Sequence, residues 1–219
     1  MQTRGLLGEE LVRLRRELTV MAAMVEEDLG KALSILRSGD EELAEEVKKS
    51  GKIVDDLQLK IEDMALVLIA TQQPVARDLR EMITVFKITS SLERIGDYGI
   101  HLVKTVKKLS ARPSFRSMER IECMTETGKN MLKAAFSAYL AQDSRAAKEA
   151  AALDDIIDSE HKALTEEVLA LMKVNPGLVK SAARLLKLSG YMERLGDHIT
   201  SICEGVIYMA EGRHVELNH

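Results

Sequence analysis

One short stretch of this sequence occurs twice, about 100 residues apart, and this internal repeat is the strongest constraint on the fold. Residues 91–97 read SLERIGD and residues 191–197 read YMERLGD, so Glu, Arg, Gly and Asp recur at the same positions. The other matched landmarks lie in turns: Gly39-Asp40 with Gln142-Asp143, and Pro74 with Pro176. Two copies of one supersecondary unit explain these matches better than chance similarity between charged segments.

Apolar residues recur at helical spacing along almost the whole chain, and no segment alternates as a half-buried strand does. Turn-forming residues interrupt the pattern in five places: 38–40, 71–74, 110–114, 142–144 and 175–177. The interruptions predict six helices, three in each repeat. The predicted fold is all-α, with two tandem antiparallel three-helix bundles, residues 1–111 and residues 112–219.

The charge and aromatic content argue against nucleic-acid binding. The chain has 31 Lys and Arg against 35 Asp and Glu, a net charge of -4, and both signs are mixed along its length. It therefore lacks the excess positive charge that neutralises a phosphate backbone. Aromatic residues make up 3% and Trp is absent, so few side chains are available for base stacking.

The terminal and apolar segments predict a soluble, cytoplasmic protein. The first residues, MQTRGLLGEELVRLRREL, carry charges every few positions and lack the apolar run of a signal peptide. The longest apolar run, MALVLIA at 64–70, is far shorter than the roughly 20 residues of a membrane span. Cys123 and Cys203 lack C-x-x-C spacing and suit free thiols in a reducing compartment. We expect no transmembrane segment.

Carboxylates stand four residues apart on three of the predicted helices. The pairs are Glu93 and Asp97, Asp154 and Asp158, and Glu193 and Asp197. The two Glu residues and the Asp154–Asp158 pair directly follow apolar residues of their helices, and Asp97 and Asp197 stand one helical turn after the Glu residues. Heptad geometry therefore predicts positions just off the core, toward solvent. Two carboxylates at this spacing repel each other by a few tenths of a kcal/mol, which favours a cation between them.

In the second repeat, the pairs on neighbouring helices stand at matching heights. Asp158 and Glu193 are nearly equidistant from the turn at Asn175, and so are Asp154 and Asp197. Antiparallel helices of this kind predict one patch of four carboxylates. An all-oxygen cluster favours Mg²⁺, Mn²⁺, Ca²⁺ or iron, and zinc is also compatible. The alternative is a solvated acidic face whose carboxylates pair with neighbouring arginines.

The first repeat has an incomplete version of this pattern. Asp55 stands at about the height of Glu93, and Asp97 follows four residues later. The counterpart of Asp154, however, is Gly51. Since fewer anionic ligands generally mean weaker binding of a hard cation, the first site is expected to be the weaker one.

Three sequence pieces together resemble the PhoU family of phosphate-signalling proteins over essentially the whole chain. They are GEELVRLRREL followed by MAAMVEEDL near the start, Gln73-Pro74-Val75-Ala76-Arg77-Asp78-Leu79-Arg80 at the second turn, and the doubled Glu-Arg-x-Gly-Asp. The resemblance implies two three-helix bundles related by pseudo-twofold symmetry, which carry multinuclear iron or zinc clusters on their surfaces, bound by paired E(D)-x-x-x-D motifs.

Residue by residue, the resemblance implies two metal sites and a regulatory role. The second site consists of Asp154, Asp158, Glu193 and Asp197, and the first consists of Asp55, Glu93 and Asp97. The resemblance implies a negative regulator that links the ATPase subunit of a phosphate ABC transporter to a sensor histidine kinase. The resemblance also implies a homodimer that associates with the membrane only through these partners.

The alternatives are a metal enzyme and a purely structural helical scaffold. A ferritin-like di-metal site needs Glu plus two Glu-x-x-His motifs in a four-helix core. Here His101 comes four residues after Asp97, and His198 directly follows Asp197, so neither has that spacing. His101 is expected to be a surface residue. A metal-dependent phosphatase would need a nucleophile or base in a cleft, and none stands out. We therefore expect a protein that is not an enzyme.

Overall fold

The computed structural model describes residues 2–108 and 115–218, and within them the chain is all-helical, with no strand. The elements in chain order are α1 (Gln2–Ser38), α2 (Glu41–Gln72), α3 (Ala76–Val106), α4 (Phe115–Ala141), α5 (Ser144–Ala151), α6 (Asp154–Val174), the 3₁₀ turn η1 (Pro176–Leu178) and α7 (Val179–Glu211). The predicted all-α class is confirmed.

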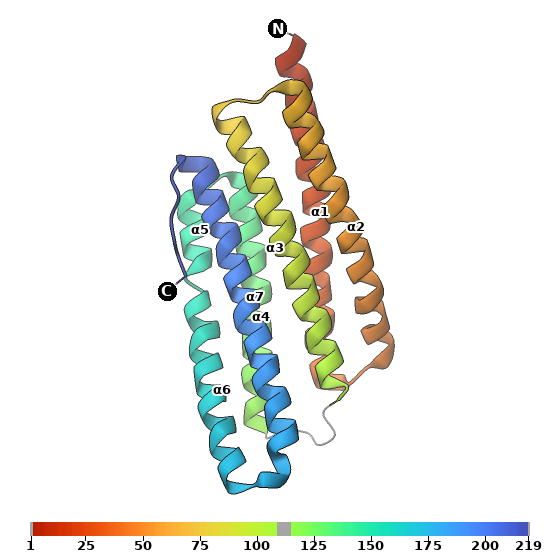
Figure 1. Cartoon of the computed structure of the whole chain (residues 1–219), viewed down its shortest axis with the longest axis vertical. Coiled ribbons are helices and arrows are strands. Elements are labelled where there is room, and N and C mark those ends of the chain that lie inside the picture. Colours follow the sequence, from red (N-terminus) through yellow and green to blue (C-terminus); the bar gives the residue numbers. More distant parts are fainter. Residues whose placement is uncertain (1, 109–114, 219) are drawn as a thin grey trace.

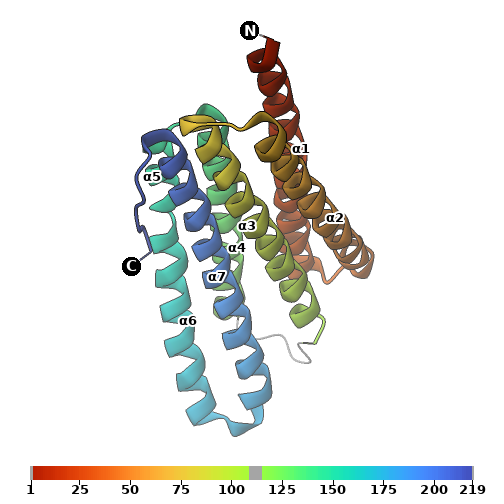
Figure 2. The ribbon, with the colours of Figure 1, turned by 45° about the horizontal axis from the view of Figure 1, so that its top comes forward.

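The helices form two antiparallel bundles that lie side by side (Figure 1). In the first bundle α1, α2 and α3 all contact one another, and in the second α4 and α7 pack against both α5 and α6. The bundles meet through α1 against α4 and α3 against α7. Turning the molecule shows α2 on one outer side and α5 with α6 on the other (Figure 2). The helices α1, α3, α4 and α7 are therefore central.

The two bundles share one hydrophobic core. Buried side chains of both repeats belong to a single cluster, which includes Leu92 and Ile95 of α3 as well as Met192 and Leu195 of α7. These residues are part of the seams that the helical spacing predicts. Because α3 and α7 cover each other, neither bundle buries its apolar surface alone.

Arginines near the start of α3 and α7 each contact the end of the other helix. Arg80 Nε donates a hydrogen bond to the carbonyl oxygen of Met209 at 3.4 Å. Arg184, near the start of α7, donates to the carbonyl oxygen of Lys108, just after α3. The last carbonyls of a helix have no partner within it and carry partial negative charge, so a guanidinium is favourable there.

The ends of the first helices confirm the sequence match between the repeats. Gly39 and Gln142 both adopt the left-handed conformation, with φ of 73° and 55°. Asp40 then accepts hydrogen bonds from two backbone N–H groups at the start of α2, and Asp143 does the same for α5. Asp is a favoured residue at this capping position.

The prediction of six helices is wrong in one place, because the middle helix of the second repeat is interrupted. Between α5 and α6, backbone hydrogen bonds join residues that are three apart instead of four. The N–H of Leu153 bonds to the carbonyl of Ala150, and the N–H of Ile156 bonds to that of Leu153. Asp154 and Asp155 then occupy the first turn of α6, where negative charge is favourable near free N–H groups. The interruption lies directly before a candidate ligand.

Two further expectations from the sequence are the boundary between the two repeats and the absence of a membrane-spanning helix. The predicted boundary between residues 111 and 112 lies outside the described residues, so it stays a prediction. In the described ranges, no helix is both long and apolar enough to cross a bilayer.

Candidate metal centre

The candidate carboxylates lie where an outer helix packs against a central one. In the first repeat Asp55 is on α2, and Glu93 and Asp97 are on α3. In the second repeat the outer helix is α6 and the central helix is α7, and the residues are Asp154, Asp158, Glu193 and Asp197. Both groups therefore lie on equivalent seams, α2 with α3 and α6 with α7, which flank the contact between α3 and α7 (Figure 1).

The expectation that these carboxylates face solvent is wrong for most of them. Glu93, Asp97, Glu193 and Asp197 are partly buried, and the side chain of Glu93 is only 20% exposed. The reason is that α3 and α7 contact neighbours on several sides, so positions beside the apolar seam are covered by the outer helix. A heptad pattern alone describes a helix with one partner.

Asp154 has the most strongly perturbed pKa among these carboxylates. Burial raises the pKa of its side chain from 3.8 to about 6. A hydrogen bond from Thr200 lowers the pKa, whereas the negative charges of Asp158, Asp197 and Glu193 raise it further. All three of these carboxylates are therefore close enough to act on Asp154 electrostatically.

The same mutual influence extends to α7. Burial raises the pKa of Glu193, and Asp197 and Asp158 add to that effect. Burial also raises the pKa of Asp197, again with a contribution from Asp158. Because neighbouring negative charges disfavour ionisation of Asp154, Glu193 and Asp197, a bound cation would favour the charged form of these three carboxylates.

A glycine and a threonine of α7 make room for the Asp154 carboxylate. Thr200 Oγ1 donates a hydrogen bond to Asp154 Oδ2 at 3.0 Å. The other oxygen, Oδ1, is buried without a hydrogen-bond partner, and it lies where a Cβ on Gly196 would clash with it. A buried carboxylate oxygen without a partner is costly unless a proton, a donor or a cation satisfies it.

The first repeat has closed the equivalent space. Gly51 replaces Asp154, and Ile100 stands at the position of Thr200. The side chain of Ile100 occupies the space where a Cβ on residue 51 would lie. The remaining carboxylates still influence one another: burial raises the pKa of Glu93, Arg94 lowers it, and Asp97 and Asp55 raise it.

Three of the four candidate carboxylates of the second repeat border a cavity of about 220 Å³. Its lining comprises Lys148, Ala151, Ala152, Asp154, Asp155, Asp158, Asp197, Leu217 and Asn218. The chemistry of the donors suits a hard cation, since carboxylate oxygens dominate the polar lining and Asp154 Oδ1 lacks a partner. Glu193 is not part of the lining.

The side chains are not yet gathered around one point. Among residues 2–108 and 115–218, no group of three or more His, Cys, Asp or Glu side chains is arranged to hold a metal ion. Binding would therefore require the carboxylates to rotate toward a shared cation. The assignment of all seven residues as metal ligands remains a prediction.

Two residues that the sequence analysis did not single out belong to the second site. His161 Nδ1 lies 2.8 Å from Ser189 Oγ, and its charge lowers the pKa of Glu193, so the ring is near that carboxylate. It stands seven residues after Asp154, which is a helical signal for a shared face. Asn218 Nδ2 donates to Asp197 Oδ1 at 3.1 Å. No local pattern places a residue from the end of the chain at this site.

An aromatic cluster occupies the contact between α3 and α7. Tyr98 stacks on Tyr191 with ring centroids 5.8 Å apart, and His101 stacks on Tyr191 at 4.8 Å. His198 also contacts Tyr98 at 5.8 Å. His101 is thus partly buried in a ring stack, which corrects its assignment as a surface residue.

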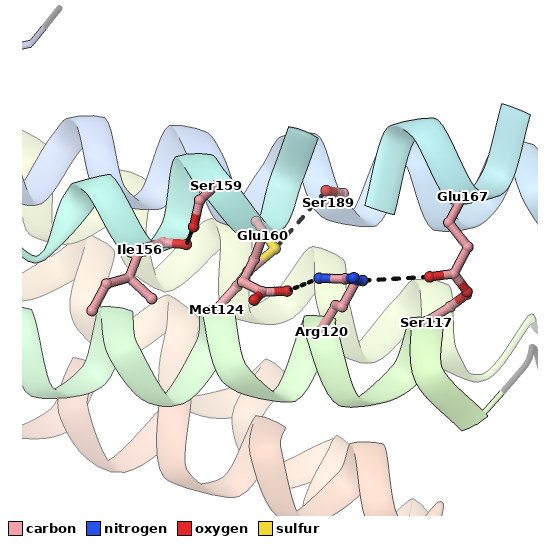
Figure 3. Close-up of polar contacts among 8 residues, drawn as sticks. All are labelled: Ser117, Arg120, Met124, Ile156, Ser159, Glu160, Glu167 and Ser189. Atoms are coloured by element: carbon pink, nitrogen blue, oxygen red, sulfur yellow. Dashed lines mark hydrogen bonds and ion pairs between the residues drawn. The ribbon is translucent and has the colours of Figure 1, made fainter. Parts of the chain in front are cut away.

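Arg120 of α4 attaches α6 to the rest of the second bundle (Figure 3). Its guanidinium donates to Glu160, and its Nε lies 3.4 Å from Glu167 Oε2, so one cation joins two turns of α6. Ser117 Oγ donates to the same Glu167 at 2.7 Å. These contacts limit the freedom of the helix that carries Asp154 and Asp158.

The fold and the paired seams define a class: an all-helical tandem repeat with a carboxylate group between the outer and central helix of each unit. The family model of the PhoU domain matches residues 18–106 and 121–206. The chain therefore belongs to the PhoU family.

Curated relatives match along the whole chain. The phosphate-specific transport system accessory protein PhoU homolog of Clostridium acetobutylicum is 35% identical over 217 residues, covering 99% of both proteins. The protein of the same name from Aquifex aeolicus is 32% identical over 213 residues, covering 97% of this chain and 96% of the relative.

Solved structures agree with the fold. PhoU from Pseudomonas aeruginosa superposes with a TM-score of 0.89 at 27% identity, covering 94% of this chain and 99% of the other. The phosphate transport system regulatory protein PhoU from Streptococcus pneumoniae gives 0.88 at 29% identity, covering 96% of this chain and 99% of the other.

Proposed function

We propose that this protein is a regulatory adaptor that restrains phosphate uptake and phosphate-starvation signalling. The observation that carries the proposal is the match to the family over both repeats, together with relatives that are named as accessory proteins of a phosphate-specific transport system. These names describe an accessory and regulatory role, which supports a protein that is not an enzyme.

The partners follow from the family resemblance. They are the ATPase subunit of a phosphate ABC transporter and a sensor histidine kinase, and the adaptor acts as a homodimer in the cytoplasm. Affinity purification of the tagged full chain from phosphate-replete cells should recover both partners, whereas a tagged unrelated helical protein should recover neither. Recovery of neither partner under either phosphate condition would contradict this role.

The second carboxylate site is proposed to bind a hard or borderline cation, with iron or zinc favoured by the family resemblance and Mn²⁺ or Mg²⁺ also compatible. Asp154, Asp158, Glu193 and Asp197 would hold it, and Asp55, Glu93 and Asp97 would hold a second, weaker site. The supporting observation is the buried Asp154 Oδ1, which lacks a partner among mutually repelling carboxylates. A cation there supplies positive charge that offsets this repulsion and joins α6 to α7.

Metal content and titration test this proposal directly. Protein purified without chelator should contain bound metal by elemental mass spectrometry. Titration of the metal-free chain with Mn²⁺ should reveal a tighter class of sites that Asp158→Ala/Asp197→Ala abolishes, and a weaker class that Asp55→Ala/Asp97→Ala abolishes. Metal-free preparations that also fail to bind Mn²⁺ would remove the metal site and leave the adaptor role to be judged by its partners.

The structure gives no support to a ferritin-like enzyme. Such a site needs carboxylates inside a four-helix core. Among the described residues, Asp28 and Glu81 are the only buried acidic side chains. Glu81 is paired with Arg15 through two hydrogen bonds of 2.5 and 2.7 Å, and Asp28 contacts Ser50. The interior is otherwise apolar or hydroxyl-bearing, so the candidate ligands lie on the outer seams.

A further inference from the structure

The segment that follows α7 folds back along the second bundle. The helix ends at Glu211, and Gly212 reverses the chain with a φ of 73°. The side chain of Arg80 lies directly against Gly212. Residues 213–218 then run beside α5 toward its junction with α6, which Figures 1 and 2 show from two directions. We call residues 212–218 the C-terminal strap.

Specific contacts hold the strap in place. The ring of His214 stacks on Tyr208 of α7 with centroids 4.2 Å apart. The backbone N–H of Leu217 donates to Glu204 Oε1 at 3.1 Å. The side chains of Val215 and Leu217 pack against the hydrophobic core. The strap is therefore a docked element with apolar, aromatic and hydrogen-bonded contacts.

The strap ends at the second carboxylate site. Asn218 Nδ2 donates a hydrogen bond to Asp197 Oδ1 at 3.1 Å. Leu217 and Asn218 form one wall of the 220 Å³ cavity whose other walls include Asp154 and Asp158. Lys148 also borders this cavity, and its ammonium lies 3.7 Å from Glu211. Asn218 thus supplies a neutral donor to a carboxylate in a strongly acidic group.

We propose that Asn218 is a positioning residue of the second site: it orients Asp197 for a cation, and the strap closes the site around it. This inference rests on the proposed binding of a cation there. Docking of the strap and binding of the cation then favour each other, so the strap reports and controls the occupancy of the site.

The chemistry of carboxylates makes this coupling favourable rather than competitive. An ionised carboxylate has about four lone-pair sites, so a donor on one of them leaves others for a cation. Hydrogen bonds to a metal-binding side chain hold it in the binding orientation, and their loss typically costs about 10–100-fold in affinity. Thermodynamic linkage requires the bound cation to stabilise strap docking by the same factor.

Titration with Mn²⁺ tests the role of Asn218 in the full chain. The background variant is Asp55→Ala/Asp97→Ala, so that only the second site reports. In this background Asn218→Ala and the similarly sized Asn218→Leu should each weaken Mn²⁺ binding about 10-fold, since neither can donate. Asn218→Gln, which retains the amide, should restore much of the affinity. The matched control Glu216→Gln, an exposed strap residue, should leave it unchanged.

Hydrogen exchange of the strap gives a second measurement. If Asn218 were a purely structural residue, its substitution would not change how exchange responds to Mn²⁺. The exchange of a peptide covering residues 212–218 should slow when Mn²⁺ is added to the wild-type chain, and slow much less in Asn218→Ala. Faster exchange on adding Mn²⁺ would show that the cation displaces the strap, and would overturn the proposal. Equal Mn²⁺ affinity of Asn218→Ala and wild type would overturn it as well.

The two proposals fail in distinguishable ways. If the wild-type second site binds no Mn²⁺, Fe²⁺ or Zn²⁺, the cation site is absent, and the positioning role of Asn218 falls with it. If the second site binds Mn²⁺ but responds to none of the Asn218 variants, the cation site stands and only the role of the strap is refuted.

Discussion

At the scale of single residues, two positions differ together between the repeats. The second repeat has Asp154 hydrogen-bonded to Thr200, and the first has Gly51 covered by Ile100. The repeat with the aspartate therefore has a hydroxyl donor next to it. The repeat with the glycine has a methyl group in the space that a side chain at this position would occupy. The first site is not a damaged copy of the second, because its packing has adapted to the missing carboxylate.

This pairing changes what substitution of Gly51 should do. Gly51→Asp alone should lower the free energy of unfolding by about 1–3 kcal/mol, because Ile100 must move and the new carboxylate lacks a donor. It should not tighten Mn²⁺ binding at the first site. The double variant Gly51→Asp/Ile100→Thr should recover stability and bind Mn²⁺ more tightly than wild type there. Urea unfolding and Mn²⁺ titration measure both effects, and a single Gly51→Asp variant that binds more tightly without loss of stability would contradict the argument.

The raised pKa of Asp154 predicts a pH dependence of the metal-free protein. Folding raises this pKa from 3.8 to about 6, so the folded chain holds more protons than the unfolded chain between these values. Stability contributed by Asp154 is therefore lost as the pH rises through that window. Asp154→Asn should raise the Tm of metal-free protein by about 2–4 °C at pH 7.5, equivalent to about 1 kcal/mol after allowance for partial exposure. At pH 4 the gain should vanish.

The same substitution should have the opposite effect once Mn²⁺ is added. A ligand raises the Tm in proportion to the logarithm of its concentration over its dissociation constant, and Asp154→Asn removes an anionic ligand. Calorimetric scans of wild type and variant, with and without Mn²⁺, measure both effects. A variant that gains equally at pH 4 and pH 7.5 would show that the charge of Asp154 is not the cause.

At the scale of helices, α6 depends on Arg120 for its attachment. The Arg120 side chain is 18% exposed and contacts Glu160 and Glu167 together. Arg120→Ala should lower the free energy of unfolding by about 1–3 kcal/mol, because two partly buried carboxylates lose their contacts with this guanidinium. The control Arg145→Ala breaks a helix-surface pair with Glu149, whose arginine is 89% exposed, and should change stability by less than about 0.5 kcal/mol. Similar losses for both variants in urea unfolding would remove the special role of Arg120.

At the scale of the whole molecule, the two repeats should unfold together. The contact between α3 and α7 includes a close approach at Gly205, where an added Cβ would lie 3.2 Å from Thr84 Cγ2. Gly205→Val should push α3 and α7 slightly apart at this point and cost about 1–3 kcal/mol, while the unfolding remains one cooperative transition. The control Gly190→Val lies in the same helix, where an added Cβ meets nothing within 4 Å, and should cost much less. Two separate unfolding transitions in the wild type or in Gly205→Val would show that the bundles are independent.

Much of the fold, and the helices on which the candidate carboxylates lie, could be predicted from the sequence, because both depend on local periodicity. Spacing of three and four residues identifies α3 and α7, and the doubled Glu-Arg-x-Gly-Asp identifies the repeat. The residues that cap α2 and α5 follow from the chemistry of the first backbone N–H groups in a helix. These features depend on residues that are close in sequence, so the amino-acid sequence alone is enough to predict them.

Only the tertiary structure decided which groups come together and how deeply they are buried. The shared core of α3 and α7, the covering of Gly51 by Ile100 and the partial burial of Glu93 all depend on helices that are distant in sequence. The hydrogen bond from Asn218 to Asp197 depends on the path of the strap after α7. The physical reason is that periodicity specifies which face of a helix is apolar, but not how many neighbours cover it or which distant side chain reaches it.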